Sequence, residues 1–282
     1  MAAEFDRAFS FRGWDKAASP KWQMVPIDGD RFLYLHDGAG LTVTSNNLPV
    51  VTVTEILARE IPASWDKRPA KAGDRFFKLH GVTKGNARIQ AKNAGGALVT
   101  EVEVDTKPLI TKNITFYFVK DSAVPAHSTR RAPAEAGEWI RVINYIYQQC
   151  NFKLVASPAT RKTIPGNLGT AIEFSDGLTD DWATLRAHRD PGADATVFQV
   201  WEYEQDGTPA TDNANGGTLA NEKMSVVEDN ASAIHPHTVG HELGHAFGLP
   251  DLSTNATRHH LMWGAGRTGQ HMDKSEINTI NP

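Results

Sequence analysis

Two histidines, two carboxylates and a glycine stand at short, regular spacing in residues 241–251, which read HELGHAFGLPD. On a helix, His241 and His245 lie about one turn apart, so both imidazole rings project from one face and can bind a single metal ion. Glu242 follows the first histidine and is placed to exchange a proton with a water molecule rather than to bind the ion. The spacing therefore predicts a helix that carries two metal ligands and a general base.

A sharp turn after this helix would supply a third ligand. Gly248 stands where the helix must stop, and glycine tolerates the left-handed conformation that such a turn requires. Pro250 cannot continue a helix and stiffens the segment that presents Asp251 to the ion. Three protein ligands leave a fourth position for water, whose pKa zinc lowers from about 15.7 toward about 7. The motif therefore predicts a catalytic zinc site at which Glu242 activates a zinc-bound water.

Other roles for these residues stay open. Asp251 could instead cap a turn or a following helix, and His259 and His260 are then its main rivals as third ligand. His237 lies one turn before the first ligand on the same helical face, where we expect a solvated histidine. Met262 on its own would be an ordinary core residue.

The pattern His-Glu-x-x-His-x-x-Gly-x-x-Asp with a downstream methionine turn resembles the metzincin clan of zinc endopeptidases, in its snapalysin-like variant with aspartate as third ligand. The resemblance covers residues 111–282 and implies a metzincin-like zincin domain, in which a twisted mixed sheet accompanies the active-site helix. It implies that Met262 forms an apolar floor beneath the zinc, and that Trp263 and Gly264 line the substrate pocket. It also implies a protein or peptide substrate that pairs with an edge strand of the sheet.

The first part of the chain differs in pattern, and we expect a domain boundary near residue 110. Short alternating runs broken by Gly, Asn and Asp turns predict an antiparallel β-sandwich over residues 1–110. The segment 76–87 resembles bacterial immunoglobulin-like (Ig-like) modules, which implies a spacer or adhesive role. The runs that carry the pattern are 41–44, 51–54, 87–92 and 102–105.

The pattern of residues 111–282 predicts a domain that contains both helices and strands. Together with the β-sandwich before it, this predicts the α+β class for the whole chain. Residues 114–119 read as a buried strand and 134–151 as a helix, with further strands at 196–203 and 223–228 before the zinc helix. Cys150 falls on the apolar face of the first helix and is expected to be a packed core thiol. A closing helix over 272–280 is expected to pack Ile277 and Ile280.

Two loops could hold a structural metal ion, although neither offers a complete set of ligands: the first is similar to the structural metal loops of some members of the clan, and the second could bind calcium. The first contains His188, Asp190 and Asp194, and the second is the Asp-Asn-Ala-Asn stretch at 212–215. Ordinary turn chemistry explains both loops equally well.

Composition and charge argue against several kinds of partner. The net charge of −4 disfavours nucleic acid or an anionic membrane as the main partner, and no stretch is apolar and long enough to span a bilayer. The first residues show no basic start followed by an apolar run, so no secretory signal is visible. The resemblance nevertheless suggests a secreted or extracellular bacterial protein, and nothing in the sequence predicts its oligomeric state.

Together these observations predict a zinc-dependent metalloendopeptidase, with His241, His245 and Asp251 as zinc ligands and Glu242 as general base. Two alternatives stay open. The protein could be an adhesin-like or latent binding protein whose zinc domain is inactive, or a zinc amidase that acts on cell-wall peptide. The motif predicts the type of reaction, whereas the polymer that is cut and the preferred cleavage sequence do not follow from it.

Overall fold

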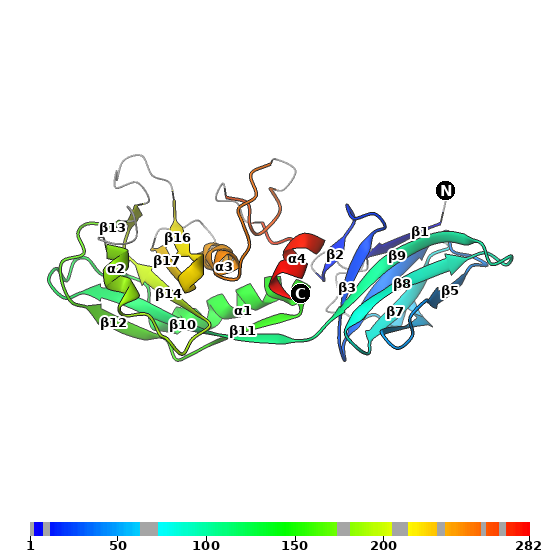
Figure 1. Cartoon of the computed structure of the whole chain (residues 1–282), viewed down its shortest axis with the longest axis horizontal. Helices are drawn as coiled ribbons and strands as arrows, with labels where there is room; N and C mark the ends of the chain where they lie inside the picture. The colour runs from blue at the N-terminus through cyan, green and yellow to red at the C-terminus, as the bar shows by residue number, and fades with distance from the viewer. Residues whose placement is uncertain are drawn as a thin grey trace. The chain divides into compact units, whose positions relative to one another are not determined.

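The computed structural model describes residues 3–7, 12–62, 73–173, 181–204, 214–229, 235–254, 258–264 and 269–282. Strands dominate and helices are few, which confirms the predicted mixed α+β class at that level (Figure 1). The chain forms two compact units, of which the first comprises Met1–Ile110, Tyr147–Phe152 and His271–Pro282, and the second Thr111–Ile146 and Lys153–Gln270. None of the helices in the described part of the chain is long and apolar enough to cross a bilayer.

Two sheets pack face to face in the first unit and share one apolar core. Leu33 and Phe77 from one sheet meet Ile89 and Val104 from the other in this core. The first sheet has the order β1 (Glu4–Arg7), β4 (Asp30–His36), β7 (Arg75–Gly81) and β6 (Val51–Ile56), and the second β2 (Trp14–Asp15), β3 (Trp22–Pro26), β9 (Leu98–Lys107), β8 (Gly85–Lys92) and β5 (Thr42–Ser45).

This unit departs from the antiparallel pattern that the sequence predicted. Strands β3 and β9 pair in parallel, with Trp22 opposite Glu103. A parallel pair needs a long crossover, which the intervening strands of both sheets provide, whereas the short turns in the sequence indicate only antiparallel hairpins. A short 3-10 helix (η1, Ala58–Glu60) follows β6.

Two segments from later in the chain complete the first unit. Helix α4 (Lys274–Ile280) buries Ile277 and Ile280 as predicted. Cys150 is fully buried in a 3-10 turn (η3, Gln148–Cys150), and burial raises the pKa of its thiol far above the usual range. The Asn281 amide donates to the carbonyl oxygen of Cys150 at 2.6 Å, which ties the end of the chain to this turn.

The second unit is built on a six-stranded sheet. Strands β10, β14 and β17 run parallel, and β16 pairs with β17 in the antiparallel direction at one edge. The order is β11 (Phe152–Ala156), β10 (Ile110–Asp121), β14 (Ala195–Val200), β17 (Met224–Glu228) and β16 (Gly216–Leu219), while β12 (Thr160–Ile164) pairs with β10; β13 (Ile172–Glu173) and β15 (Tyr203–Glu204) form a separate pair.

Alternate residues of each strand face opposite sides of this sheet, and helices cover both sides. On one side, Phe116 and Phe118 of β10 contact Trp139 of α1 (Ala136–Tyr147), and α3 (His235–Ala246) lies next to α1 (Figure 1). On the other side, Val119 and Phe198 share a core with Trp182 of α2 (Asp181–Arg186). The sheet thus gives α3 a rigid apolar base.

The helix predicted over 134–151 is shorter in the structure. It consists of a 3-10 turn (η2, Pro133–Glu135), then α1, and then η3. Asn151 adopts the left-handed conformation with φ of 52°, and this residue ends the helical segment. A further 3-10 turn (η4, Ala220–Glu222) joins β16 to β17.

A chain of buried hydrogen bonds connects the end of β17 to the first residue of α3. His235 Nε2 lies 2.9 Å from Oε1 of Gln199, whose amide nitrogen donates to the Asp229 carboxylate at 3.2 Å. Asp229 also accepts from the backbone N–H of Arg130 at 2.6 Å and from the Thr129 hydroxyl. These bonds link His235, the first residue of α3, to Gln199 of β14 and to Asp229 at the end of β17.

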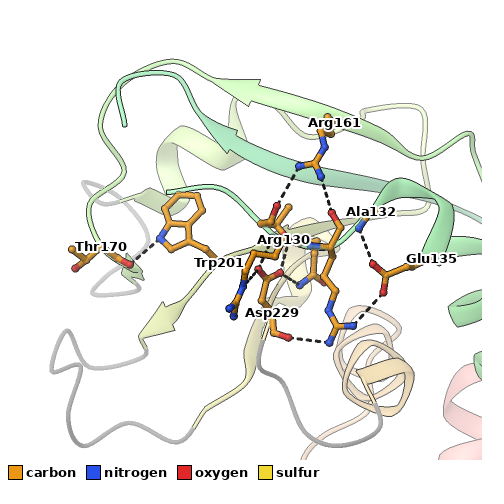
Figure 2. A network of polar contacts seen from close by, with 10 residues as sticks. Arg130, Ala132, Glu135, Arg161, Thr170, Trp201 and Asp229 are labelled. Carbon is orange, nitrogen blue, oxygen red and sulfur yellow. Dashed lines mark hydrogen bonds and ion pairs between the residues drawn. The ribbon is translucent and has the colours of Figure 1, made fainter. Parts of the chain in front are cut away.

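Figure 2 shows how this anchor continues around Asp229. Arg131 donates to the Asp229 carbonyl oxygen at 2.9 Å and pairs with Glu135 at 3.2 Å. Arg161 donates to the carbonyl oxygens of Thr129 and Arg131 at 3.2 and 3.1 Å. Residues 129–131, which follow β10, are therefore held by the side chains of Asp229 and Arg161.

The environment of His235 makes the stability of the second unit sensitive to acid. Its ring contacts that of Trp139 in a tilted arrangement, with centroids 4.4 Å apart. Burial, followed by the charge of Arg131, lowers the pKa of His235 to about 4, against the pull of Asp229 and Glu135. Among the described residues, His235 Nδ1 has no hydrogen-bond partner, so a proton there would be buried without an acceptor. The folded protein therefore holds His235 in its neutral form.

We expect His235 to stabilise the fold fully above pH 6.5 and progressively less as the pH falls toward 4, because only the unfolded chain takes up the proton in that interval. The expected loss is about 3 kcal/mol in the free energy of unfolding. Urea unfolding between pH 4 and 8 measures it in the wild type and in His235→Gln, which cannot titrate. An equal loss of stability in both proteins would contradict this account of His235.

Candidate metal centre

Helix α3 carries three of the candidate residues. His241 and His245 lie on its outer side, and Glu242 lies on the side that packs on the sheet. His241 and His245 are half-buried, with ring centroids 4.7 Å apart and an interplanar angle of 89°. Glu242 is only 5% exposed and faces the sheet. The helix therefore separates two ligand-type side chains, which reach a common space, from a buried acid beside them.

Backbone carbonyl oxygens hold both imidazole rings. His241 Nδ1 lies 2.9 Å from the carbonyl oxygen of Leu261, and His245 Nδ1 lies 2.8 Å from that of Leu249. A carbonyl oxygen can only accept, so each Nδ1 must carry a proton. In the neutral ring, Nε2 is then the nitrogen with a free lone pair, which is the arrangement that metal-binding histidines adopt.

The turn after α3 places the carboxylate. Gly248 has φ of 97°; its N–H donates to the His245 carbonyl oxygen, and the N–H of Leu249 donates to that of Gly244, both at 3.0 Å. This pair of bonds is the Schellman motif, which ends helices at a left-handed residue. It turns the chain back, so that Leu249 reaches the ring of His245 and Asp251 reaches both rings.

Three side chains converge at this point. Asp251 Oδ1 lies 3.2 Å from His241 Nε2 and 3.5 Å from His245 Nε2, and all three atoms lie within 4.8 Å of one another. Ligand atoms about 2.0–2.2 Å from one tetrahedral zinc ion lie about 3.3–3.6 Å apart. The two distances from Asp251 Oδ1 are close to this spacing, so the three side chains could bind one zinc ion.

The charges of the group are complementary. Hydrogen bonds from His241 and His245 hold the pKa of Asp251 well below its usual range, so its carboxylate stays ionised. Burial opposes protonation of both rings, but bonding to Asp251 and the charge of Glu242 raise the pKa of His241 and of His245. Burial also raises the pKa of Glu242, against the attraction of the two rings and a hydrogen bond from Thr218. A metal ion bound here would take the place of the protons that the two Nε2 atoms share with Asp251.

The predicted methionine turn lies against the segment that carries Asp251. Met262 is fully buried, and its carbonyl oxygen accepts from the N–H of Leu252 at 2.7 Å. The N–H of Gly264 donates back to the Leu252 carbonyl oxygen at 3.3 Å. A Cβ on Gly264 would lie 3.0 Å from Asp251 Oδ1, so this glycine gives the carboxylate its room. We expected Gly264 and the half-buried Trp263 to line a substrate pocket; the contact found for Gly264 is with Asp251.

The rival histidines take other places. Among the described residues, neither His259, which is exposed, nor the buried His260 belongs to the group formed with Asp251. The expectation that His237 is solvated is wrong: the residue is 5% exposed, and its Nε2 lies 3.0 Å from Nε2 of Gln270. Gln270, from a later segment of the chain, contacts this ring, and helical spacing does not predict such a tertiary contact.

In the first of the two candidate metal loops, the carboxylates of Asp190 and Asp194 accept hydrogen bonds from other groups of the protein. Asp190 accepts from the Thr115 hydroxyl at 2.6 Å, and Asp194 accepts from the backbone N–H of Asn113 at 2.8 Å. These hydrogen bonds favour an ordinary turn over a structural metal site. In the second loop, 212–215, the first two residues lie outside the described part of the chain.

One side chain at the site was missed by the sequence analysis. Thr218 on the edge strand β16 donates its hydroxyl to Oε2 of Glu242 at 2.6 Å. A threonine in a short strand matches no metal or catalytic motif, and the two residues are 24 positions apart. Only the packing of α3 on β16 and β17 brings them together.

We expect Asp251→Ala to weaken zinc binding by more than about 100-fold, because loss of an outer-shell partner alone costs about 10- to 100-fold. His80→Ala, in strand β7 of the first unit, is the matched control and should bind zinc like the wild type. Competition with a chromophoric chelator measures both affinities. Normal zinc affinity in Asp251→Ala, or a loss in His80→Ala equal to that in Asp251→Ala, would contradict the assignment of Asp251.

Gly264→Ala should weaken zinc binding by about 10-fold, since the added Cβ displaces the Asp251 carboxylate by a few tenths of an ångström. Gly137→Ala provides the control, because a Cβ at Gly137 would meet no atom within 4 Å. The same competition titration applies, with thermal unfolding to show that both variants are folded. Equal zinc affinities in the two variants would show that Gly264 does not set the position of Asp251.

No protein-family model matches the chain, and no curated protein sequence matches it significantly. Among solved structures, a zinc-dependent peptidase from Methanocorpusculum labreanum (strain Z) is similar over 59% of this chain and 92% of its own, with 12% identity and a TM-score of 0.32. The S-layer protein SbsC is similar over 38% of this chain, with 15% identity and a TM-score of 0.24; the match spans only 12% of the length of that protein.

The sialic acid binding region of an adhesin from Streptococcus sanguinis SK1 is similar over 42% of this chain and 34% of its own, with 8% identity and a TM-score of 0.23. All three likenesses are distant, and none assigns this chain to a family or an activity.

Proposed function

We propose that this protein is a zinc-dependent metalloendopeptidase with a metzincin-like catalytic unit. The observation that carries the proposal is the convergence of His241 Nε2, His245 Nε2 and Asp251 Oδ1 beside the buried carboxylate of Glu242. Two imidazoles and one carboxylate are a common ligand set of catalytic zinc, and three protein ligands leave one position open. Zinc held by these residues would polarise the substrate carbonyl group and acidify a water molecule.

Glu242 performs the proton transfers in the proposed reaction. Its carboxylate takes one proton from the attacking water as the new C–O bond forms. It then gives that proton to the peptide nitrogen as the C–N bond breaks, so that an amine and a carboxylic acid leave. The neighbouring position of Glu242 on α3 keeps it beside the ligands without making it one of them.

Strand β16 offers a surface on which an extended peptide could lie. Among the strands that the structure describes, it is the last on its side of the sheet, and it begins with Gly216 and Gly217. Its outer edge presents backbone groups that can pair with another strand, which is a general way of holding peptide substrates. Since α3 packs directly on β16, a peptide paired there would pass close to Glu242.

The protein should cleave an unstructured protein such as casein, and a zinc chelator should stop the cleavage until zinc is restored. Glu242→Gln should lower the rate by about 10²–10⁴-fold while zinc stays bound, because only the proton acceptor is lost. Glu138→Gln, a change on the exposed face of α1, should leave the rate unchanged.

Full activity in Glu242→Gln would remove this residue as the base. Stoichiometric zinc without cleavage of casein would contradict a general endopeptidase and favour a latent or adhesin-like protein. Cleavage of a cell-wall peptide but not of casein would favour the amidase. An extracellular location stays a prediction from the sequence.

A further inference from the structure

We propose that Thr218 is a positioning residue for Glu242: its hydroxyl holds one oxygen of the carboxylate and thereby presents the other oxygen to the reacting water. The inference rests on the proposed function, because it assigns a partner to the base of that reaction. It concerns a residue outside the zinc motif, on a different element of the fold.

The direction of side chains along β16 places Thr218 under the helix. Residues two apart on a strand face the same side, so Gly216 and Thr218 share one face. A Cβ on Gly216 would lie 3.2 Å from Glu242 Cγ, which shows that this face looks toward α3. A Cβ on Gly217 would instead meet the Tyr203 hydroxyl on the opposite side.

The hydroxyl of Thr218 has one proton to donate, and the geometry selects its acceptor. Oε2 of Glu242 lies 2.6 Å away, whereas the Glu242 carbonyl oxygen lies 3.1 Å away. The Ser225 hydroxyl lies 2.9 Å from Thr218 Oγ1 and can donate to it. Each donated bond polarises the next, so the chain from Ser225 through Thr218 strengthens the final bond to the carboxylate.

This bond constrains a side chain that would otherwise sample several rotamers. Glu242 is 5% exposed, and its Cγ would lie 3.2 Å from a Cβ on Gly216, so its stem packs closely against this glycine. With Oε2 held, the hydrogen bonds of the described residues leave Oε1 of Glu242 without a donor. Oε1 is then the oxygen that can accept a proton from water.

The expected loss of rate without the hydrogen bond from Thr218 follows from the precise placement of groups that proton transfer requires. A misplacement of about 1 Å in a reacting group can lower a rate by about 100-fold. Removing the hydroxyl leaves the carboxylate present but less ordered, so the loss should be smaller than that caused by removing the base. Neither zinc ligation nor pairing of a peptide with the β16 backbone involves this hydroxyl, so both should persist.

Thr218→Val, which keeps the shape of the side chain, should lower kcat by about 10- to 100-fold and leave KM and zinc affinity within about twofold of the wild type. Thr218→Ser should recover most of the lost kcat, because it restores the hydroxyl. Thr163→Val, an exposed threonine in strand β12, is the matched control and should behave like the wild type. Steady-state cleavage of a fluorogenic peptide that the wild type cuts gives kcat and KM, with thermal unfolding as a folding check.

A double-mutant cycle tests whether Thr218 acts through Glu242. In Glu242→Gln, adding Thr218→Val should change the residual rate by less than about twofold, because the carboxylate that Thr218 positions is already gone. Should Thr218→Val fold poorly, Thr218→Ala replaces it in both comparisons.

A wild-type kcat in Thr218→Val would overturn the inference while the proposed function stands. An equal loss in Thr218→Val and Thr218→Ser, or a full additional loss in the Glu242→Gln background, would overturn it as well. A zinc-loaded wild type that cuts no peptide would overturn the proposed function itself, and the inference with it.

Discussion

The approach of one short carboxylate to two imidazoles is the constraint on which the rest of the site depends. Aspartate has only one methylene, so the backbone must come close to the rings before Asp251 Oδ1 can lie 3.2 and 3.5 Å from their Nε2 atoms. Two glycines make this approach possible. Gly248 reverses the chain with φ of 97°. Gly264 leaves room for the carboxylate, because a Cβ at Gly264 would lie 3.0 Å from Asp251 Oδ1. A side chain at either position would strain the site.

The same turn segments also orient the rings, so ligand position and ring orientation are coupled. The carbonyl oxygen of Leu249, in the Schellman turn, accepts from His245, and that of Leu261, before Met262, accepts from His241. Backbone bonds between Leu252 and the methionine turn join these two segments. The three candidate ligands are therefore held by connected stretches of backbone, whereas Glu242, the proposed base, is held from the sheet by Thr218.

Local chemistry was predictable from the sequence, and contacts between distant segments were not. Spacing alone predicted helix α3, its end near Gly248 and the mixed α+β class, because each depends on neighbouring residues. The parallel pairing of β3 with β9, the burial of His237 and the bond from Thr218 to Glu242 all depend on tertiary packing. The α-helix predicted over 134–151 ends at Tyr147, because its last residues form a 3-10 turn that the left-handed Asn151 caps, and helical periodicity does not distinguish a 3-10 turn from the end of an α-helix.

The central claim is that three named side chains bind one zinc ion. A crystal structure of the zinc-loaded protein, with anomalous data collected at the zinc absorption edge, tests it directly. The account predicts one strong peak about 2.0–2.2 Å from His241 Nε2, His245 Nε2 and a carboxylate oxygen of Asp251, with Glu242 outside the coordination sphere. A peak held by His259 or His260 in place of Asp251, or no peak at α3, would contradict it.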